Sequence, residues 1–259
     1  MAAVALHHRV TGPLSGEFVL LGGSLGSTHR LWDELVPELA DYQVVAFDIR
    51  GHGDSPSAVG PVTVPDLASD VVALATIVGA ERFHYVGLSL GGAIGQQLAL
   101  DAPERLRSLT LACTAARFGD ADTWLDRAAA VRDDGMEQLR NPTAGRWFTD
   151  EVRLHRPGRV TEILDQLVAT DPGSYAAVCE SLAGFDTRAR LGEITAPTLV
   201  VTGDGDPTCP PEVTRVLHEG IPGADHVLLE GSAHLGNVCR PDAFAAAVRD
   251  HLAAHRVAR

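Results

Sequence analysis

The chain has 259 residues, of which 45% are hydrophobic and 21% charged, as expected for one soluble globular domain with a large core. Its formal net charge of −13 argues against a long-range attraction to nucleic acid or to an anionic membrane surface. All 21 basic residues are arginine, which excludes a Schiff-base lysine, a pyridoxal phosphate enzyme and a lysine-containing phosphate loop.

Targeting and metal-binding patterns are missing from the sequence. The amino terminus through Arg9 has only a short apolar run, and no stretch approaches the roughly 20 apolar residues of a membrane span. We therefore expect a cytoplasmic protein, and we predict no metal and no cofactor. The cysteines lack metal-binding spacing and are expected to be reduced thiols at positions 113, 179, 209 and 239.

The first strands and helices are predicted from short patterns. A weak strand pattern at 4–10 and a turn at 11–16 predict an amino-terminal hairpin that leads into a strand at 17–21. A glycine-rich loop follows at 22–27, and apolar residues at helical spacing predict a helix over 31–39. The loop is interpreted either as an oxyanion-hole loop or as a plain connection between strand and helix.

The apolar run 43–48 predicts a strand that is buried on both faces of a parallel sheet. It ends in a glycine-rich turn, and we expect Asp48, Arg50 and His52 to hold this turn rather than to perform chemistry. Apolar residues repeat every three or four positions after Pro65 and predict a helix that starts at this proline and ends at Gly79.

The stretch Gly87-Leu88-Ser89-Leu90-Gly91-Gly92 lies where an apolar strand pattern meets a small-residue helical pattern. Glycines on both sides of the serine permit the sharp strand-to-helix turn of a nucleophile elbow, which exposes the serine at the end of the strand. The helix that follows also directs its positive end and free N–H groups at the serine. A tight turn with an idle serine is the alternative.

The second half of the chain predicts an inserted group of helices. A strand pattern at 106–113 is followed by short helical patterns over 117–189, and strand patterns resume at 196–202 and 226–230 before a closing helix over 241–255. We predict an α/β protein with a doubly wound, mostly parallel sheet. Its core comprises residues 1–116 and 190–259, and residues 117–189 form a helical cap.

A serine nucleophile needs a base to take its proton and a third group to orient that base. His234 is the predicted base, because it lies in a small-residue loop four residues past a strand that we expect to be buried. Asp206 is the preferred acid, since its position leaves enough loop to turn toward the histidine. Asp204 as the acid, or both aspartates as loop-capping residues, stays open. Other histidines are expected to be solvated or terminal at 7, 8, 155, 251 and 255, and packed at 218 and 226.

An oxyanion must be met by N–H groups that are already in place. We expect one from Leu90, directly after the predicted nucleophile, and one from Ser24 in the glycine-rich loop, with Leu25 as its neighbour.

Several motifs resemble the α/β-hydrolase superfamily along nearly the whole chain, and 3-oxoadipate enol-lactone hydrolases in particular. In the core they are Ser24-Leu25-Gly26-Ser27 with Leu31-Trp32-Asp33, Arg50-Gly51-His52-Gly53-Asp54-Ser55, and the elbow. In the cap they are Thr114-Ala115-Ala116-Arg117-Phe118-Gly119, Arg146-Trp147-Phe148-Thr149, and Tyr175 followed by Cys179-Glu180. Departures from the pattern are Gly22-Gly23, Leu90 and Ala233-His234-Leu235-Gly236.

The resemblance implies a serine hydrolase that opens a small enol-lactone, with 3-oxoadipate enol-lactone first, through an acyl-enzyme on Ser89. The implied partner is a small anionic lactone or ester. Arg117 and Arg146 are the candidate cations for its carboxylate, and Leu25 and Trp147 are candidate contacts; surface arginines paired with acids are the alternative. Assembly into a homo-oligomer is left open.

Other activities occur on the same fold. A general carboxylesterase or perhydrolase and a C–C bond hydrolase would use the same three residues, and a non-catalytic ligand receptor is a further alternative. A dehalogenase is disfavoured, because its nucleophile would be an aspartate where Ser89 stands.

Overall fold

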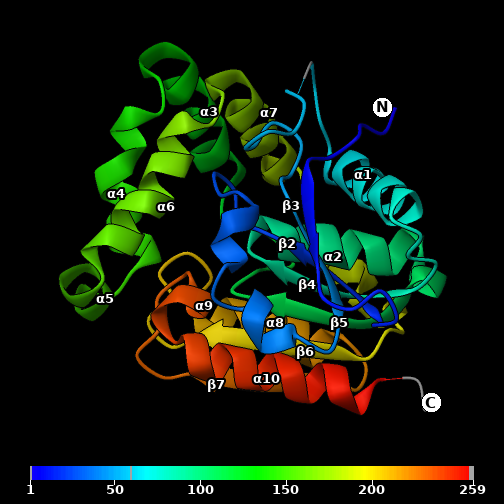
Figure 1. Cartoon of the computed structure of the whole chain (residues 1–259). Helices are drawn as coiled ribbons and strands as arrows, with labels where there is room; N and C mark the ends of the chain where they lie inside the picture. Colours follow the sequence, from blue (N-terminus) through cyan, green and yellow to red (C-terminus); the bar gives the residue numbers. More distant parts are fainter. Residues whose placement is uncertain (1, 59, 257–259) are drawn as a thin grey trace.

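One mixed sheet forms the centre of the molecule (Figure 1). The computed structural model describes residues 2–58 and 60–256. The strand order is β1-β3-β2-β4-β5-β6-β7; β1 is antiparallel to β3, and the remaining neighbours are parallel. The strands are β1 (His8–Thr11), β2 (Phe18–Gly22), β3 (Gln43–Phe47), β4 (Phe83–Leu88), β5 (Leu106–Ala112), β6 (Thr198–Gly203) and β7 (Asp225–Leu229). This arrangement confirms the predicted fold class.

Helices surround the sheet. Every residue of β3 and β4 is buried, and since successive side chains point to opposite faces, both faces of the sheet are covered there. The helices of the core are α1 (Val64–Ile77), α2 (Leu90–Asp101), α8 (Pro211–Gly220), α9 (Gly236–Cys239) and α10 (Pro241–Ala254). Short 3-10 helices are η1 (His29–Trp32), η2 (Val36–Leu39), η3 (Pro103–Arg105), η4 (Glu137–Leu139) and η5 (Arg188–Glu193).

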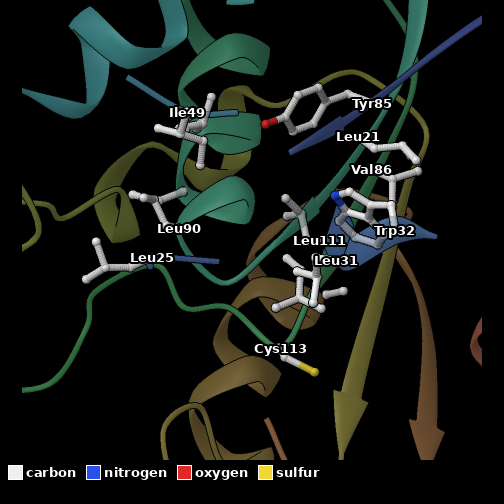
Figure 2. Packing of buried hydrophobic residues seen from close by; sticks show 14 of the residues in the cluster. Leu21, Leu25, Leu31, Trp32, Ile49, Tyr85, Val86, Leu90, Leu111 and Cys113 are labelled. Atoms are coloured by element: carbon white, nitrogen blue, oxygen red, sulfur yellow. The ribbon is translucent and has the colours of Figure 1, made fainter. Parts of the chain in front are cut away.

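The main hydrophobic core lies between the sheet and these helices. Figure 2 shows Leu21, Tyr85 and Leu111 from three neighbouring strands, together with Trp32 of η1. The ring of Trp32 lies 6.2 Å from that of Phe244 on α10, so the connection between β2 and β3 packs against the last helix. Among the described residues, no helix combines the length and the apolar character that a membrane span requires.

A second group of helices lies between β5 and β6 in the chain, at the upper left of Figure 1. It consists of α3 (Ala121–Asp134), α4 (Arg140–Trp147), α5 (Asp150–His155), α6 (Pro157–Ala169) and α7 (Pro172–Ala183). Helix α3 packs along α7, and α4 packs along α6. Residues 117–189 are all described and contain no strand; we call these five helices the cap helices, while the predicted domain boundaries stay a prediction.

The predicted amino-terminal hairpin is wrong. Strand β1 pairs with β3, from His8 opposite Phe47 to Thr11 opposite Val44, and not with β2, whose two edges are occupied by β3 and β4. The intervening turn passes over the start of β3, where a Cβ atom on Gly12 would lie 2.0 Å from the Tyr42 carbonyl oxygen.

Residues 31–39 do not form the predicted α-helix. They belong to the 3-10 helices η1 and η2, with Pro37 in the first turn of η2. Proline has no N–H and its ring clashes with the carbonyl group of the preceding turn, which disfavours a continuous α-helix through this position.

Two burial predictions near the end of the chain are also wrong. Strand β7 lies at the edge of the sheet and exposes Asp225, His226 and Leu228, because it has a neighbour on one side only. His251, predicted to be solvated, is buried on α10 with its ring 4.7 Å from that of His255.

The turn after β3 is held by Asp48, as predicted, but Arg50 has another contact. The Asp48 carboxylate accepts hydrogen bonds from the backbone N–H of Asp54 at 3.1 Å and of His29 at 2.6 Å. The buried Arg50 guanidinium reaches α1, where it binds the Asp70 carboxylate at 2.6 and 2.8 Å. Arg50 therefore anchors the turn to a helix.

Candidate active site

Ser89 occupies a strained position between β4 and α2. Its φ is 57° and its ψ is −113°, a backbone conformation that non-glycine residues rarely adopt outside functional sites. The turn needs glycine on both sides, since a Cβ atom would lie 2.2 Å from the Gly91 carbonyl oxygen at Gly87, and 2.1 Å from the Gly22 carbonyl oxygen at Gly91. The Thr114 hydroxyl, just after β5, donates to the Ser89 carbonyl oxygen at 2.7 Å and so helps to fix the turn.

The structure brings Ser89, His234 and Asp206 together in one hydrogen-bonded series. His234 Nε2 lies 2.9 Å from Ser89 Oγ, and His234 Nδ1 lies 2.8 Å from Asp206 Oδ2. The three residues are buried and come from the ends of β4, β7 and β6, respectively. With its proton on Nδ1, the imidazole donates to the carboxylate and accepts from the serine, which is the arrangement that a general base requires.

The two candidate acids, Asp206 and Asp204, have different hydrogen-bond partners. Asp206 Oδ1 accepts from the N–H groups of Thr208 and Cys209 at 2.8 and 3.0 Å, which leaves Oδ2 for His234. Burial alone would raise the Asp206 pKa, but His234 and these N–H groups hold that pKa below its ordinary value. Asp204 instead accepts from the N–H groups of Gly231 and Ser232 at 2.9 and 3.0 Å. Asp204 therefore caps the neighbouring loop and does not contact His234.

Ser24 and Leu90 lie on two backbone segments in direct contact. The Gly91 N–H donates to the Gly23 carbonyl oxygen at 2.9 Å, which joins the first turn of α2 to the loop after β2. A turn fixes that loop, because the Ser27 N–H and hydroxyl both donate to the Ser24 carbonyl oxygen and Gly26 adopts a φ of 83°. Leu90 begins α2, where N–H groups lack helical acceptors. Their role in binding an oxyanion stays a prediction.

The same arrangement of elements occurs in a known family. Residues 17–156, more than half of the chain, match the family described as alpha/beta hydrolase fold. The chain belongs to this family. Residues 174–258 of this α/β-hydrolase also match the family described as TAP-like protein.

Relatives of this α/β-hydrolase include enol-lactonases and an esterase. The chain is 35% identical to 3-oxoadipate enol-lactonase 2 of Acinetobacter baylyi, over 95% of its own length and 92% of that protein. The enol-lactonase structure from Burkholderia xenovorans LB400 has 35% identity and a TM-score of 0.94, covering 97% of this chain and 99% of that one. A thermophilic esterase from Thermogutta terrifontis has 26% identity and a TM-score of 0.91, covering 97% and 94%. The predicted resemblance and the prediction of a carboxylic ester hydrolase are confirmed.

The cap of this α/β-hydrolase is joined to the loop that carries His234. The N–H of His234 donates to the Arg146 carbonyl oxygen at 3.3 Å, and the N–H of Leu235 donates to the Trp147 carbonyl oxygen at 3.1 Å. Trp147 is buried, whereas Arg146 is half-buried and donates to the Thr143 hydroxyl at 3.1 Å. The structure therefore places Arg146 and Trp147 next to the predicted base.

The other two predicted contact residues lie in different environments. Leu25 is buried in the loop after β2 and belongs to the same hydrophobic cluster as Leu90 (Figure 2). Arg117 is exposed and lines a surface groove with Asp120, Arg188 and residues of α8, a groove to which Ser89 and His234 do not contribute. The charge of Arg117 acts on Asp186, and its role in binding substrate stays a prediction.

Arg127 is a half-buried residue of α3 to which the sequence pattern assigned no role. Its guanidinium carbon lies 4.8 Å from the centre of the Trp124 ring, and its charge acts on Arg146. The helical pattern around Trp124 predicts that Arg127 lies on a helix. It does not predict which residues of the other cap helices lie near its side chain.

Two groups of side chains have the composition of a metal site. In the first, Asp48 already accepts from His7 Nδ1 at 2.8 Å and His29 Nδ1 at 3.0 Å, in addition to its two backbone bonds. In the second, Cys209 lies with Asp206 and His234. Burial and the Asp206 charge raise the pKa of the Cys209 thiol, which disfavours the thiolate that binds metal. Neither group gives grounds for proposing an ion.

Proposed function

We propose that this α/β-hydrolase opens a small enol-lactone by nucleophilic catalysis, with 3-oxoadipate enol-lactone as its substrate. The observation that carries the chemistry is the hydrogen-bonded series Ser89–His234–Asp206, with distances of 2.9 and 2.8 Å. The choice of substrate is supported by the names of the Acinetobacter and Burkholderia relatives and by their coverage of nearly the whole chain.

In the first half of the reaction, Ser89 Oγ attacks the lactone carbonyl carbon while its proton passes to His234 Nε2. The carbonyl oxygen becomes an oxyanion, which accepts hydrogen bonds from the N–H groups of Leu90 and Ser24. The intermediate then collapses, the ring C–O bond breaks, and the acyl group stays on Ser89. His234 Nε2 gives the proton taken from Ser89 to the departing oxygen, which leaves as an enol and relaxes to a ketone, so its departure is easy and His234 is neutral again.

In the second half, a water molecule attacks the acyl carbon and gives its proton to His234. The ester bond to Ser89 breaks, the serine regains its proton from His234, and the product leaves with a new carboxylate. Asp206 keeps Nδ1 protonated throughout and stabilises the imidazolium, since its carboxylate is buried and fixed by two N–H groups.

A general carboxylesterase is the second candidate, because the Thermogutta esterase shares the fold over 97% of this chain. The two functions differ in substrate preference and not in the reacting groups. Purified enzyme should be assayed for kcat/KM with 3-oxoadipate enol-lactone and with p-nitrophenyl acetate, using Ser89→Ala as the background. A large preference for the lactone is expected. Lactone opening no faster than in the Ser89→Ala sample, with p-nitrophenyl acetate still hydrolysed, would reject the lactonase and favour the esterase.

A further inference from the structure

Two residues at the ends of neighbouring strands share a rare backbone conformation. Ser89 has a φ of 57° and Cys113 a φ of 45°, and within the described part of the chain no other non-glycine residue has a positive φ. They follow Leu88 and Ala112, which are partners in the register of β4 and β5. Such strain persists only where the surrounding structure enforces it, and it is typical of functional sites. The nucleophile turn accounts for Ser89, whereas Cys113 needs an explanation of its own.

The sulfur of Cys113 lies against the segment that follows the predicted base. Cys113 is fully buried in the hydrophobic cluster at the end of β5 (Figure 2). Gly236 is the first residue of α9 and comes two positions after His234, and a Cβ atom on it would lie 3.3 Å from Cys113 Sγ. The sulfur therefore packs on the backbone that leads out of the loop of His234.

Cys113 is also joined to the strand that leads to Asp206. Its N–H donates to the Val201 carbonyl oxygen in β6 at 2.8 Å. Burial raises the pKa of the Cys113 thiol and the Asp206 charge raises it further, whereas hydrogen bonds from the backbone N–H groups of Gly236 and Gly203 oppose this rise. Gly203 is the last residue of β6, three positions before Asp206. The thiol is thus a neutral acceptor between the strand of the acid and the loop of the base.

The next residue, Thr114, makes the connection to the nucleophile. Its hydroxyl donates to the Ser89 carbonyl oxygen at 2.7 Å, and a Cβ atom on Gly92 would lie 2.5 Å from Thr114 Cβ. The backbone at Cys113 sets the direction of the chain between these two side chains. An extended residue at this position would move either the sulfur or the hydroxyl away from its partners, which explains why the left-handed conformation is kept.

We propose that Cys113 and Thr114 are positioning residues that hold the three segments of the site in their mutual geometry. Thr114 fixes the turn of Ser89, and the Cys113 sulfur fixes the loop of His234 against the strand of Asp206. This inference rests on the proposed function, because it takes Ser89 as the nucleophile. Proton transfer needs the serine hydroxyl within hydrogen-bond reach of the imidazole, so a small displacement of either segment slows the attack.

The first test separates the sulfur from the strained backbone. Cys113→Ala removes the sulfur and keeps the strain, whereas Cys113→Gly removes both. Each should lower kcat for p-nitrophenyl acetate about 10-fold and change KM less than twofold. Cys113→Ser keeps an acceptor on a shorter bond, so its kcat should lie between those of Cys113→Ala and the wild type. Val248→Ala is the control, because it removes buried volume from α10 and should keep the wild-type kcat.

The second test concerns the hydroxyl of Thr114. Thr114→Val has a similar shape but leaves the Ser89 carbonyl oxygen without this donor, and it should lower kcat about 10-fold with little change in KM. Thr114→Ser retains the hydroxyl and should keep most of the wild-type kcat. Tm measurements on every variant identify samples that are unfolded at the assay temperature.

A third measurement isolates the attack by Ser89 from the later steps. Diethyl p-nitrophenyl phosphate reacts with an active serine: the Ser89 Oγ–phosphorus bond forms, p-nitrophenolate leaves, and the serine proton passes to His234. The amount of p-nitrophenolate counts the reactive sites, and its time course gives the rate constant of attack. Cys113→Ala and Thr114→Val should react at all sites, with rate constants about 10-fold below those of the wild type and Val248→Ala.

Contrary results reject the positioning roles separately. Wild-type kcat in Cys113→Ala or Cys113→Gly would reject the role of the sulfur, and wild-type kcat in Thr114→Val would reject that of the hydroxyl. Fewer reactive sites with an unchanged rate constant, or an equal loss of kcat in Val248→Ala, would assign both residues a purely structural role. If the lactone is not hydrolysed but these results hold, the positioning roles stand and the proposed lactone is wrong.

Discussion

The backbone N–H of His234 donates a hydrogen bond to the carbonyl oxygen of Arg146 at 3.3 Å, so the loop of the predicted base is attached to the end of a cap helix. A residue of the cap thereby fixes a residue of the core at the place where chemistry is proposed. Side-chain changes at Arg146 leave this backbone bond in place, which allows its charge to be tested without disturbing His234.

Ser89→Ala and His234→Ala should each reduce kcat for p-nitrophenyl acetate by roughly 10⁴-fold or more, because the nucleophile and its base act as one unit. Far-ultraviolet circular dichroism and Tm measurements should show that both variants remain folded. Either variant retaining most of its turnover would remove that residue from the mechanism.

Asp206→Asn and Asp204→Asn form a matched pair. Asp206→Asn should lower kcat by about 10⁴-fold, because an amide donor facing His234 Nδ1 favours the wrong tautomer. Asp204→Asn should keep most of kcat and lose at most about 1 kcal/mol of unfolding free energy, since this exposed carboxylate caps two backbone N–H groups. A larger loss of kcat in Asp204→Asn would reverse the assignment of the acid.

The elbow glycine and a cap glycine should respond in opposite directions to alanine. Gly91→Ala places a methyl group about 2.1 Å from the Gly22 carbonyl oxygen, so the unfolding free energy should fall by at least about 2 kcal/mol, with loss of activity. Gly145 lies within α4 with no atom near its Cβ position, and Gly145→Ala should stabilise by about 0.5–1 kcal/mol. Urea unfolding monitored by fluorescence gives both values; similar stability of Gly91→Ala and wild type would contradict the packing described for the elbow.

Acid should destabilise the protein through two buried histidines at the far end of the sheet. Burial lowers the pKa of both His84 and His251 to about 4. In the unfolded chain they titrate near 6.5, so between about pH 6.5 and 4 the unfolded state binds more protons than the folded state. The free energy of unfolding therefore decreases as the pH is lowered through this range. Urea titrations at pH 7, 6 and 5 should show this decline, and a double variant with glutamine at both positions should show a shallower one. An identical slope in the double variant would exclude these histidines as the cause.

The sequence could predict those features whose signals are local. Strong apolar runs placed β3 and β4, and the glycines around Ser89 specified the elbow before any partner was known. His234 and Asp206 followed because parallel strands bring their carboxyl ends to one edge of the sheet, so loops after β6 and β7 approach the loop after β4.

Features that depend on long-range packing could not be predicted in this way. The weak pattern of β1 does not specify that its partner is β3 rather than β2. Arg117 and Arg127 both follow β5 in the cap segment, yet Arg117 is exposed, whereas Arg127 is half-buried and its charge acts on Arg146.

The two backbone hydrogen bonds between the end of α4 and the loop of His234 also restrict how a ligand can reach Ser89. Lifting this end of the cap would break both bonds and release the loop that holds the imidazole. A ligand route that leaves the reacting groups assembled must therefore keep Arg146 and Trp147 in place. The end of α4 is thus a fixed part of the cap, and any movement that admits a ligand takes place in other cap segments.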